Sequence, residues 1–308
     1  MRENKMNRPL LSIVIANYNY GRFLDEAIKS VISQDMGDKV ELIICDAAST
    51  DNSVEIIKKY ANGLPPNTSL YDWEPGNSQL TTKDYRLSTK ITWWCSEPDK
   101  GQSEAFNKGF AHARGRYLTW LNADDLLVPG SLKRIIASLR RHPNCEWFTG
   151  NFYRFEEKSK LVSEIGWGPR FYPAFLQFPR SPVVVFGPTS FFSKKIYEEV
   201  GKIDERFHLM MDTDLWVRFM LAGIKQRRIA HFCWAFRMHE LSKTAEYGDH
   251  RLSEKRKLQF RVEMDLMYEK TRYKPMRLLY YLLLVWRILD LSLIEKMLYH
   301  MCVLRVAR

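Results

Sequence analysis

The sequence predicts an α/β fold with a mostly parallel central sheet. Two runs that are apolar at all but one position, residues 10–16 and 40–45, have the composition of strands that are buried on both faces. Each run ends in polar residues and is followed by apolar residues at helical spacing. Two consecutive strand–helix units favour a right-handed, doubly wound sheet flanked by helices.

The first predicted strand leads into a helix whose first turn is expected to contain Asp25 and Glu26, where acidic side chains complement the helix dipole. The second strand ends at Asp46. This carboxylate either accepts hydrogen bonds from a nucleobase or ribose, or it caps the turn into the next helix. Asn52 and Glu55 have the spacing of a capping pair for that next helix.

Residues 62–90 form a polar insertion, longer than most connections, for which a hairpin is one interpretation. Residues 91–96 then resume the sheet, and a helix is expected from about residue 102 to 113. Gly109 and Gly115 are poor helix formers. They indicate either a close approach of this backbone to a ligand or a strand, or ordinary sequence variation.

A further short apolar run, at residues 117–121, stops at Asn122, Asp124 and Asp125. In an open α/β sheet, ligands bind at the carboxyl ends of the strands. Two neighbouring carboxylates at such an edge suit a hard divalent cation, which often clamps a diphosphate. A solvated turn whose aspartates cap the next helix is an equally good interpretation of these residues alone.

The second half of the chain is expected to continue the α/β pattern. It contains a helix at residues 131–139 and strands at residues 145–155 and 229–236. Residues 166–188 are rich in proline, glycine and aromatic residues and are predicted to be irregular; their rings either stack on a ligand or cover the sheet. Asp212 and Asp214 stand at the head of a predicted helix, where acidic residues routinely stabilise the dipole, and this is our interpretation of Asp214.

The chain of 308 residues has a formal net charge of +11, and its last fifth supplies most of that charge. Residues 251–308 contain thirteen Lys or Arg and six Asp or Glu, a surplus of seven. Such a tail implies an anionic partner, either a nucleic acid or an acidic membrane surface. The five cysteines are widely spaced without a CxxC pair, and the first apolar run is too short for a secretory signal, which points to a reducing cytoplasm. Neither the G-x-G-x-x-G motif nor the P-loop motif occurs, which argues against a dinucleotide enzyme or a P-loop enzyme.

Five motifs, taken in order, resemble those of the inverting glycosyltransferases of family 2, which have the GT-A fold of nucleotide-diphospho-sugar transferases. The motifs are IVIANYN, ICDAASTDNS, SEPDKGQSEAFNKGFAHARGRYLTWLNADD, MDTDLWVRF and RMHELSKT, and they cover about residues 10–245. The resemblance implies a Rossmann-like GT-A catalytic domain at residues 1–250. Its nucleotide-binding half is expected at about residues 10–130 and its acceptor half at about residues 131–250, followed by a basic helical tail at residues 251–308.

The resemblance also implies roles for the residues that match these motifs. The nucleotide side of the donor site is matched by Ala16, Asn17, Tyr18, Asp46 and Asp99. The acidic motif that binds the ribose and a Mg²⁺ or Mn²⁺ ion on the diphosphate reads Asn122-Ala123-Asp124-Asp125. Asp124 is expected to contact the metal directly, with Asp125 supporting it. His239 resembles the late histidine that reaches the metal or diphosphate, and Asp212 matches the general base.

This set of residues supplies what sugar transfer requires. A carboxylate takes the proton of the acceptor hydroxyl as it attacks the anomeric carbon, and a metal ion neutralises the leaving diphosphate. The family's processive synthases carry a Q-x-x-R-W motif and membrane spans, which this sequence lacks. The resemblance therefore implies a non-processive, inverting hexosyltransferase that moves one sugar, with a UDP-sugar as the favoured donor. The implied acceptor is a hydroxyl of a glycan or lipid-linked oligosaccharide in surface polysaccharide or cell-envelope glycan biosynthesis.

Three departures from the family pattern bear on activity. Asp46-Ala47-Ala48 replaces the usual D-G-S, Asn122 replaces an acidic residue, and Met211 precedes the presumed base where Glu is common. None of them removes the base or the second acidic position, so an active enzyme is expected. The alternative is a catalytically silent protein of the same fold that binds or scaffolds a membrane-associated glycan assembly complex.

The tail is rich in leucine and aromatic residues from residue 276 onward. Its longest charge-free apolar run, residues 278–286, is too short to span a bilayer. We expect one or two helices that lie on an anionic membrane surface, which would place the protein on the inner face of the cytoplasmic membrane. The alternative is a helical hairpin that packs on the catalytic domain or on a second subunit. A nucleic-acid partner is not expected, because no recognition motif accompanies the basic residues.

Overall fold

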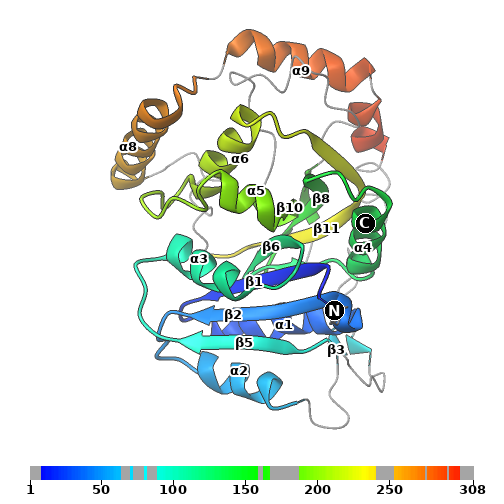
Figure 1. Cartoon of the computed structure of the whole chain (residues 1–308), viewed down its shortest axis with the longest axis vertical. Helices are drawn as coiled ribbons and strands as arrows, with labels where there is room; N and C mark the ends of the chain where they lie inside the picture. The colour runs from blue at the N-terminus through cyan, green and yellow to red at the C-terminus, as the bar shows by residue number, and fades with distance from the viewer. Residues whose placement is uncertain are drawn as a thin grey trace, which may run out of the picture.

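The structure is a computed structural model that describes residues 8–63, 70–71, 80–81, 89–158, 162–166, 187–240, 253–274, 276–289 and 291–298. One sheet organises this part of the chain, with the strand order β5-β2-β1-β6-β10-β8-β11-β7 and with β9 paired to β8. Figure 1 shows that helix α9 lies at the opposite end of the molecule from β5 and α2.

The first half of the chain forms the parallel part of the sheet. Its strands are β1 (Leu11–Asn17), β2 (Val40–Asp46), β5 (Ile91–Ser96) and β6 (Tyr117–Asn122). Every pairing among these four strands is parallel. The intervening helices are α1 (Gly21–Ile32), α2 (Ser53–Ala61) and α3 (Gln102–His112).

The alternation of side chains along β1 explains why helices cover both faces of the sheet. Ile13 and Ile15 pack in one buried cluster with α1 and α2, whereas Val14 packs in another buried cluster with α3. Successive side chains of a strand point to opposite faces. A strand that is buried at nearly every position therefore needs a layer of helices on each side.

The second half of the chain extends the sheet with both pairing directions. Its strands are β7 (Leu126–Leu127), β8 (Trp147–Glu156), β9 (Val162–Gly166), β10 (Ser190–Ser193) and β11 (Gln226–Met238). β10 is antiparallel to its neighbours β6 and β8, whereas β11 is parallel to β8. The helices are α4 (Ser131–Arg141), α5 (Lys194–Glu199) and α6 (Met211–Leu221). The predicted α/β fold with a mostly parallel sheet is confirmed, while the short strands β7 and β9 were not predicted.

Two predicted helix starts are wrong in detail. Helix α1 begins at Gly21, so Asp25 and Glu26 lie beyond its first turn. At the start of α2 the side chain of Asn52 makes no capping hydrogen bond. The neighbouring Asp51 takes this place: its Oδ1 accepts from the backbone N–H of Ser53 at 3.0 Å, and its Oδ2 accepts from that of Gly21 at 2.8 Å. One carboxylate thus holds the starts of two helices together.

The glycines around α3 lie where the backbone approaches β1 closely. A Cβ atom on Gly109 would lie 2.4 Å from Cγ1 of Val14, and one on Gly115 would lie 2.7 Å from the backbone nitrogen of Ser12. Contacts this short are not tolerated between real Cβ atoms and their neighbours. Of the two interpretations of these glycines, close approach to a strand is therefore confirmed.

The inserted segment and the irregular segment are described only in part. Within residues 62–90, β3 (Leu70–Tyr71) pairs antiparallel with β4 (Leu80–Thr81), which agrees with a hairpin. Residues 167–186, which make up most of the predicted irregular segment, lie outside the described residues. Its end is a 3₁₀ turn at Gly187–Thr189 that leads directly into β10.

The tail is helical, as predicted. Helices α8 (Glu254–Thr271) and α9 (Arg277–Leu289) are followed by a further helical segment at residues 292–298. In the described part of the chain, no helix is both long and apolar enough to cross a membrane.

Candidate active site

A cluster of hydrogen bonds joins the carboxyl ends of β1, β2 and β5 around one buried carboxylate. Asp46 is 1% exposed, and its Oδ1 accepts from Asn17 Nδ2 at 2.6 Å and from Ser49 Oγ at 2.5 Å. Its Oδ2 accepts from the backbone N–H of Ser49 at 3.0 Å and from Ser96 Oγ at 2.6 Å. Asp46 therefore fixes the positions of three polar side chains at the edge where open sheets bind ligands.

The loop after β2 shows how the chain accommodates its departure from the usual D-G-S pattern. Ala48 has φ of 55°, the left-handed conformation that glycine adopts without strain. The hydroxyl comes one residue later than expected, from Ser49, which bonds Asp46 and also accepts from the backbone N–H of Asn19 at 2.8 Å. The sequence analysis did not identify Ser49 or Ser96. The serine in the motif ICDAASTDNS was the available signal for Ser49.

The end of β1 presents unsatisfied and exposed groups beside this cluster. Asn17 is 4% exposed, and its Oδ1 is buried without a hydrogen-bond partner. Buried polar atoms are nearly always paired in native proteins, so this acceptor is an exception at the strand end that meets the Asp46 cluster. The ring of Tyr18 is 58% exposed, and Ala16 is half-buried on the same strand.

Asp99 lies in the turn between β5 and α3, where its Oδ1 accepts from the backbone N–H of Gly101 at 2.8 Å. Burial raises the pKa of this carboxyl above its ordinary value, and the negative charge of Asp46 adds to the effect. Gln102, the first residue of α3, links this turn to the acidic motif, because its Nε2 donates to Asn122 Oδ1 at 2.8 Å. The predicted nucleotide side and the predicted metal side are thus physically connected.

The acidic motif after β6 contains two carboxylates in different states. Asp125 is fully buried; its Oδ1 accepts from the backbone N–H of Arg237 at 2.9 Å, and its Oδ2 accepts from Asn122 Nδ2 at 2.7 Å. Burial, and next the charge of Asp124, raises the pKa of Asp125 well above its ordinary value. The side chain of Asp124 is partly exposed at 16%, and its Oδ2 lies 3.0 Å from Nε2 of His239.

His239 and Arg237 come from the end of β11 and complete this side of the site. The imidazole of His239 packs against Phe23, with 4.5 Å between ring centroids, and against Tyr20 at 5.8 Å. Burial, followed by the charges of Asp124 and Asp125, raises the pKa of Tyr20 to about 12. The guanidinium of Arg237 donates to the backbone oxygen of Asp124 at 2.8 Å. It also pairs with Glu26 of α1 at 2.5 Å, so α1, β11 and the acidic loop are tied together.

The donor set fits a divalent cation that arrives with a diphosphate. Asp124 offers a carboxylate oxygen and His239 an imidazole nitrogen, and both are ligands for Mn²⁺. Among the described residues, no cluster of three or more His, Cys, Asp or Glu side chains could hold a metal ion by itself. Ions such as Mg²⁺ are typically bound by one or two carboxylates together with substrate phosphates, which matches this sparse set.

Asp212, the predicted base, lies in the first turn of α6. Its Oδ1 accepts from the backbone N–H of Thr213 at 2.6 Å, and the carboxylate also accepts from the N–H of Gly187. Asp212 is half-buried, and this desolvation raises its pKa above the ordinary value, because the hydrogen bonds from Thr213 and Gly187 do not replace all the water that the charge has lost. A Cβ atom on Gly187 would lie 2.7 Å from the ring of Trp120 in β6. The start of α6 is therefore held against the strand that delivers the acidic motif.

Helix α8 holds the segment that leads into Asp212. Glu263 is 1% exposed, and its carboxylate accepts from three successive backbone amides, those of His208 at 3.0 Å, Leu209 at 3.0 Å and Met210 at 2.9 Å. It also accepts from Gln259 Nε2 at 2.7 Å. The sequence analysis did not identify Glu263, because nothing in the local sequence distinguishes it from the other charged residues of this helix.

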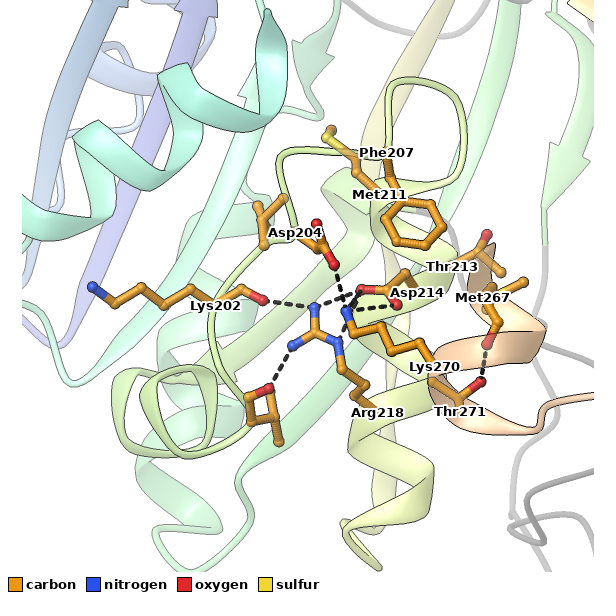
Figure 2. Close-up of polar contacts among 12 residues, drawn as sticks. Lys202, Asp204, Phe207, Met211, Thr213, Asp214, Arg218, Met267, Lys270 and Thr271 are labelled. Atoms are coloured by element: carbon orange, nitrogen blue, oxygen red, sulfur yellow. Dashed lines mark hydrogen bonds and ion pairs between the residues drawn. The ribbon is translucent and has the colours of Figure 1, made fainter. Parts of the chain in front are cut away.

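A second buried carboxylate joins α6 to α8 (Figure 2). Asp214 is fully buried and pairs with Arg218 at 2.7 Å, and Lys270 of α8 lies 3.2 Å from it. Arg218 donates in addition to the backbone oxygens of Val200 and Lys202. Asp214 lies in the first turn of α6, as predicted, and its carboxylate pairs there with two cationic side chains.

Comparison with known protein families identifies related sequences over much of the chain. The profile of glycosyl transferase family 2 matches residues 12–75 and 94–201. An uncharacterized glycosyltransferase of Nostoc sp. is 35% identical over 126 residues, which are 41% of this chain and 31% of that protein. An uncharacterized glycosyltransferase of Methanocaldococcus jannaschii is 25% identical over 241 residues, 76% of this chain and 72% of that protein. The minor teichoic acid biosynthesis protein GgaB of Bacillus subtilis is 28% identical over 145 residues, 47% of this chain and 13% of that protein.

Solved structures share the fold at low sequence identity. TarS 1–349 of S. aureus in complex with UDP-GlcNAc has a TM-score of 0.53 and 14% identity, with 76% of this chain and 60% of that chain covered. The mannosyltransferase PcManGT of Pyrobaculum calidifontis in complex with GDP-Man and Mn²⁺ has a TM-score of 0.51 and 16% identity, with 77% and 59% covered. The present chain therefore spans about three-fifths of the length of each of these two structures.

Proposed function

Because the chain belongs to glycosyltransferase family 2, we propose that it moves one sugar from a nucleotide diphosphate donor to an acceptor hydroxyl. The proposed reaction depends on Mg²⁺ or Mn²⁺ and inverts the anomeric centre by a single displacement. Residues 1–250 would form the catalytic domain, with the donor bound by about residues 10–130 and the acceptor by about residues 131–250. Residues 251–308 would form the tail.

The observation that best supports this proposal is the close approach of the side chains of Asp124 and His239. The two residues are 115 positions apart in sequence, yet their side chains approach to 3.0 Å at the carboxyl end of β6. The Asp46 cluster lies two strands away, at the carboxyl end of β2, with β1 between them. A nucleotide bound along this edge, with its base toward Asp46 and Asn17, would place its diphosphate toward Asp124.

The residues of this chain have distinct tasks in the proposed reaction. Asp124 and His239 would hold the metal ion. Asp125 is enclosed by protein donors and would keep the acidic loop in place. A bound divalent cation would neutralise, as a Lewis acid, the charge that develops on the leaving diphosphate. Ala16, Tyr18 and Asp99 would line the nucleotide beside Asn17 and Asp46, and Asn122 would offer an amide to the ribose.

Asp212 would act as the general base. A carboxylate of ordinary pKa is a weak base at neutral pH, and a base becomes more effective as its pKa approaches the working pH. Burial moves the pKa of Asp212 in that direction. The acceptor hydroxyl would lose its proton to this carboxylate as the oxygen attacks the anomeric carbon, and the bond to the nucleotide diphosphate would break on the opposite side.

We favour a uridine diphosphate hexose as the donor, because TarS has the same fold and was solved with UDP-GlcNAc. The GDP-Man complex of PcManGT provides the competing choice. We favour a hydroxyl of a cell-envelope glycan or lipid-linked oligosaccharide as the acceptor, and the support is that GgaB, which is similar over part of this chain, is a teichoic acid biosynthesis protein.

Thermal unfolding with UDP, GDP and TDP, each with and without Mn²⁺, tests the donor site. A ligand at one hundred times its dissociation constant stabilises a protein by about 2.7 kcal/mol, which raises the melting temperature measurably. We expect a Mn²⁺-dependent rise with UDP in the native protein and in Asp38→Ala, a matched control at an exposed aspartate before β2. We expect no such rise in Asp124→Ala.

The outcome also decides between the enzyme and its rival. A Mn²⁺-dependent shift that survives in Asp124→Ala would remove Asp124 from the proposed metal site. The absence of a shift with all three nucleotides would favour the catalytically silent scaffold protein. That alternative is suggested by Asn122 and Met211, which depart from the family pattern at two motif positions.

A further inference from the structure

Asn151 of β8 is a buried side chain without a hydrogen-bond partner. It is 1% exposed, and neither its Nδ2 nor its Oδ1 bonds another group of the described structure. A carboxamide has two donors and an acceptor, and removing them from water without new hydrogen bonds costs free energy. An apolar side chain of the same size would fill this position at lower cost. The packing of β8 therefore does not explain why an asparagine is present.

The alternation of side chains along β8 places Asn151 on the face of the sheet that α6 covers. Trp147 packs in one buried cluster with α6, and its ring stacks on that of Trp216 with 5.5 Å between the centroids. Every second residue of a strand points to the same face, so Asn151, four positions later, shares the face of Trp147. The next residue of this face, Tyr153, belongs to a separate apolar cluster. Asn151 is thus a polar residue between two apolar clusters.

The register of the sheet places Asn151 level with the end of β6. One residue of β10, Phe192, pairs with both β6 and β8. Four residues along each strand from these pairs lie Asn122 in β6 and Asn151 in β8. At this level β10 has not yet begun, and the 3₁₀ turn that precedes it contacts both strands. The two asparagines therefore lie on either side of the turn, on one face of the sheet.

The same 3₁₀ turn contacts the proposed base. Gly187, the first residue of the turn, donates its backbone N–H to Asp212. The order across this level of the sheet is therefore Asn122, the turn with Asp212, and Asn151. In a single displacement the acceptor oxygen approaches the anomeric carbon from the side opposite to the leaving diphosphate. With the diphosphate at the end of β6, as proposed above, and the base at the turn, the acceptor extends toward β8.

We propose that Asn151 binds a hydroxyl group of an acceptor sugar and helps to determine which acceptor the protein uses. A carboxamide both donates and accepts hydrogen bonds, which matches the neighbouring hydroxyls of a sugar ring. The pairing of β11 with β8 is irregular on both sides of Phe232, the partner of Asn151, and such irregularities are common beside active sites. The inference rests on the proposed function, to which it adds one contact for the acceptor.

The hexose of the donor has the same hydroxyl chemistry as an acceptor sugar. It is bonded to the diphosphate, which the proposed metal site at Asp124 holds at the end of β6. Asn151 lies beyond Asp212 in the order across the sheet, so its position favours the acceptor. Titrations with separate donor and acceptor probes distinguish the two sources.

Saturation-transfer difference NMR of the full chain tests the proposal. The probes are the methyl glycosides of glucose, galactose and N-acetylglucosamine, titrated with and without saturating UDP and Mn²⁺, which fill the donor site. We expect the native protein to bind at least one of them saturably. Asn151→Leu keeps the size of the side chain and removes its hydrogen bonds, so it should bind that glycoside about tenfold more weakly. Asn151→Ser, whose hydroxyl is too short to replace the carboxamide, should show a loss as well if leucine disturbs the fold.

Thr119 of β6 provides a matched control. It is also 1% exposed, and its Oγ1 has no partner within the described residues. Its neighbours Leu118 and Trp120 belong to the cluster of α6, so Thr119 points to the opposite face of the sheet. Thr119→Val removes an unpaired hydroxyl at constant size and should bind the glycoside like the native protein. Asn151→Leu should melt at the native temperature or higher, since it too removes an unpaired buried group.

Four outcomes would overturn the proposal. The first is that the native protein binds none of the three glycosides. The second is an equal loss of binding in Thr119→Val. The third is a marked fall in the melting temperature of Asn151→Leu, which would show that the fold itself bonds this amide. The fourth is that Asn151→Leu binds the glycoside normally and loses the extra stabilisation that UDP-GlcNAc gives over UDP, which would assign the amide to the donor hexose.

Failure of the proposed function gives a different result. Asp212→Asn should still bind the glycoside, because glycoside binding does not need the base. A native protein without a UDP shift that nevertheless binds the glycoside through Asn151 would contradict sugar transfer and retain the sugar contact. A UDP shift with glycoside binding that does not depend on Asn151 would contradict this inference alone.

Discussion

Two carboxylates of the candidate site, Asp46 and Asp212, differ in how fully protein donors satisfy them. At the end of β2, Asp46 accepts four hydrogen bonds from three neighbouring residues, so both of its oxygens are occupied by protein donors. At the start of α6, Asp212 accepts from Thr213 and from the N–H of Gly187, and burial raises its pKa. The first carboxylate is fixed in place as an organiser of its neighbours. The second is partly desolvated, which suits the general base that we propose it to be.

This difference separates two kinds of functional residue. A carboxylate surrounded by donors contributes by holding other groups in position, and its replacement should affect folding and binding together. A carboxylate that is poorly solvated is costly to the fold, and its replacement should affect the chemical step while leaving the fold intact. Three variants, Asp212→Asn, Asp46→Asn and Glu263→Gln, test this division, with Glu41→Gln and Glu254→Gln as controls.

The largest expected effect is on the chemical step. Asp212→Asn removes the proposed base and retains the size of the side chain. General base catalysis typically contributes about 10²–10⁴-fold to the rate, so kcat should fall by about that factor. Steady-state measurements of sugar transfer check this, and Mn²⁺-dependent stabilisation by UDP in the same variant should be unchanged. A variant that keeps more than a tenth of the native kcat would contradict the assignment of Asp212.

The next largest effect is expected at Asp46, for which the same strand offers a control. Asp46→Asn disrupts a buried acceptor with four bonds and should lower the free energy of unfolding by about 2–3 kcal/mol. It should also abolish stabilisation by UDP. Glu41 lies near the opposite end of β2, is 1% exposed as well, and accepts from Ser12, Arg114 and Gly115. Glu41→Gln should cost similar stability and leave nucleotide binding unchanged.

The two variants together sharpen the comparison. Denaturant unfolding gives the stability loss of each, and thermal shifts with UDP and Mn²⁺ give the binding. If Glu41→Gln lost nucleotide binding as fully as Asp46→Asn, the loss would report general damage to the sheet, and Asp46 would have no special place in the site.

The parallel half of the fold was predictable because its strands are rich in apolar residues, and β1, β2 and β6 are buried on both faces. Four runs rich in apolar residues were predicted as strands, and the observed strands agree with them within one or two residues at each end. They are residues 10–16, 40–45, 91–96 and 117–121. Strands β7 and β9 were missed for the converse reason. β7 is two residues long, and β9 has the sequence VSEIG, whose two apolar residues form neither a continuous apolar run nor an alternating pattern.

The partners of the site residues were much less predictable than the residues themselves. Family motifs marked Asp46, Asp124, Asp212 and His239, because each lies in a run of matching residues. Arg237 also lies in a matched motif, but its contacts to Glu26 and to the backbone of Asp124 span 211 and 113 positions. Long-range contacts of this kind depend on how the sheet brings strand ends together, and no local pattern records them.

Glu263 is the clearest case of a role that only the fold shows, and it supplies the third prediction. Its carboxylate binds the backbone amides of residues 208–210, directly before the helix that carries Asp212. Glu263→Gln turns one acceptor into a donor that faces N–H groups, so the free energy of unfolding should fall by about 1–2 kcal/mol. We expect kcat to fall several-fold as Asp212 loses its fixed position, with the UDP shift retained.

Glu254 of the same helix is the matched control for Glu263. It is exposed and pairs with Lys257 one turn away at 2.8 Å. Glu254→Gln should leave both stability and kcat unchanged, since exposed pairs contribute little. If Glu263→Gln lowered stability and UDP binding but not kcat, α8 would brace the fold without positioning the base.

The smallest expected effect is a change in the pH dependence of stability, and it tests the difference between Asp46 and Asp212 most directly. The folded-state pKa of Asp212 is raised, so its protonated form is favoured in the fold relative to the unfolded chain. This contribution to stability is fully present below the unfolded pKa of about 3.9 and is lost as the pH rises through the folded pKa. At neutral pH the native protein therefore carries a charged, desolvated group that Asp212→Asn replaces by a neutral one. The variant should melt at the same temperature as the native protein or slightly higher at neutral pH, and this advantage should vanish toward acid.

Melting curves of the two proteins across the acid-to-neutral range measure this difference. The same raised pKa places the acid limb of the native kcat/KM profile, which reports the free enzyme, above the range of an ordinary aspartate, because the base is inactive while protonated. The two measurements are linked: the stability difference should develop from about pH 3.9 up to the folded pKa of Asp212, and kcat/KM should rise through that same folded pKa. A variant that is less stable than the native protein at neutral pH would mean that Thr213 and Gly187 hold the charge of Asp212 as firmly as the donors around Asp46 hold theirs. The distinction between an organising carboxylate and a reactive one would then be lost.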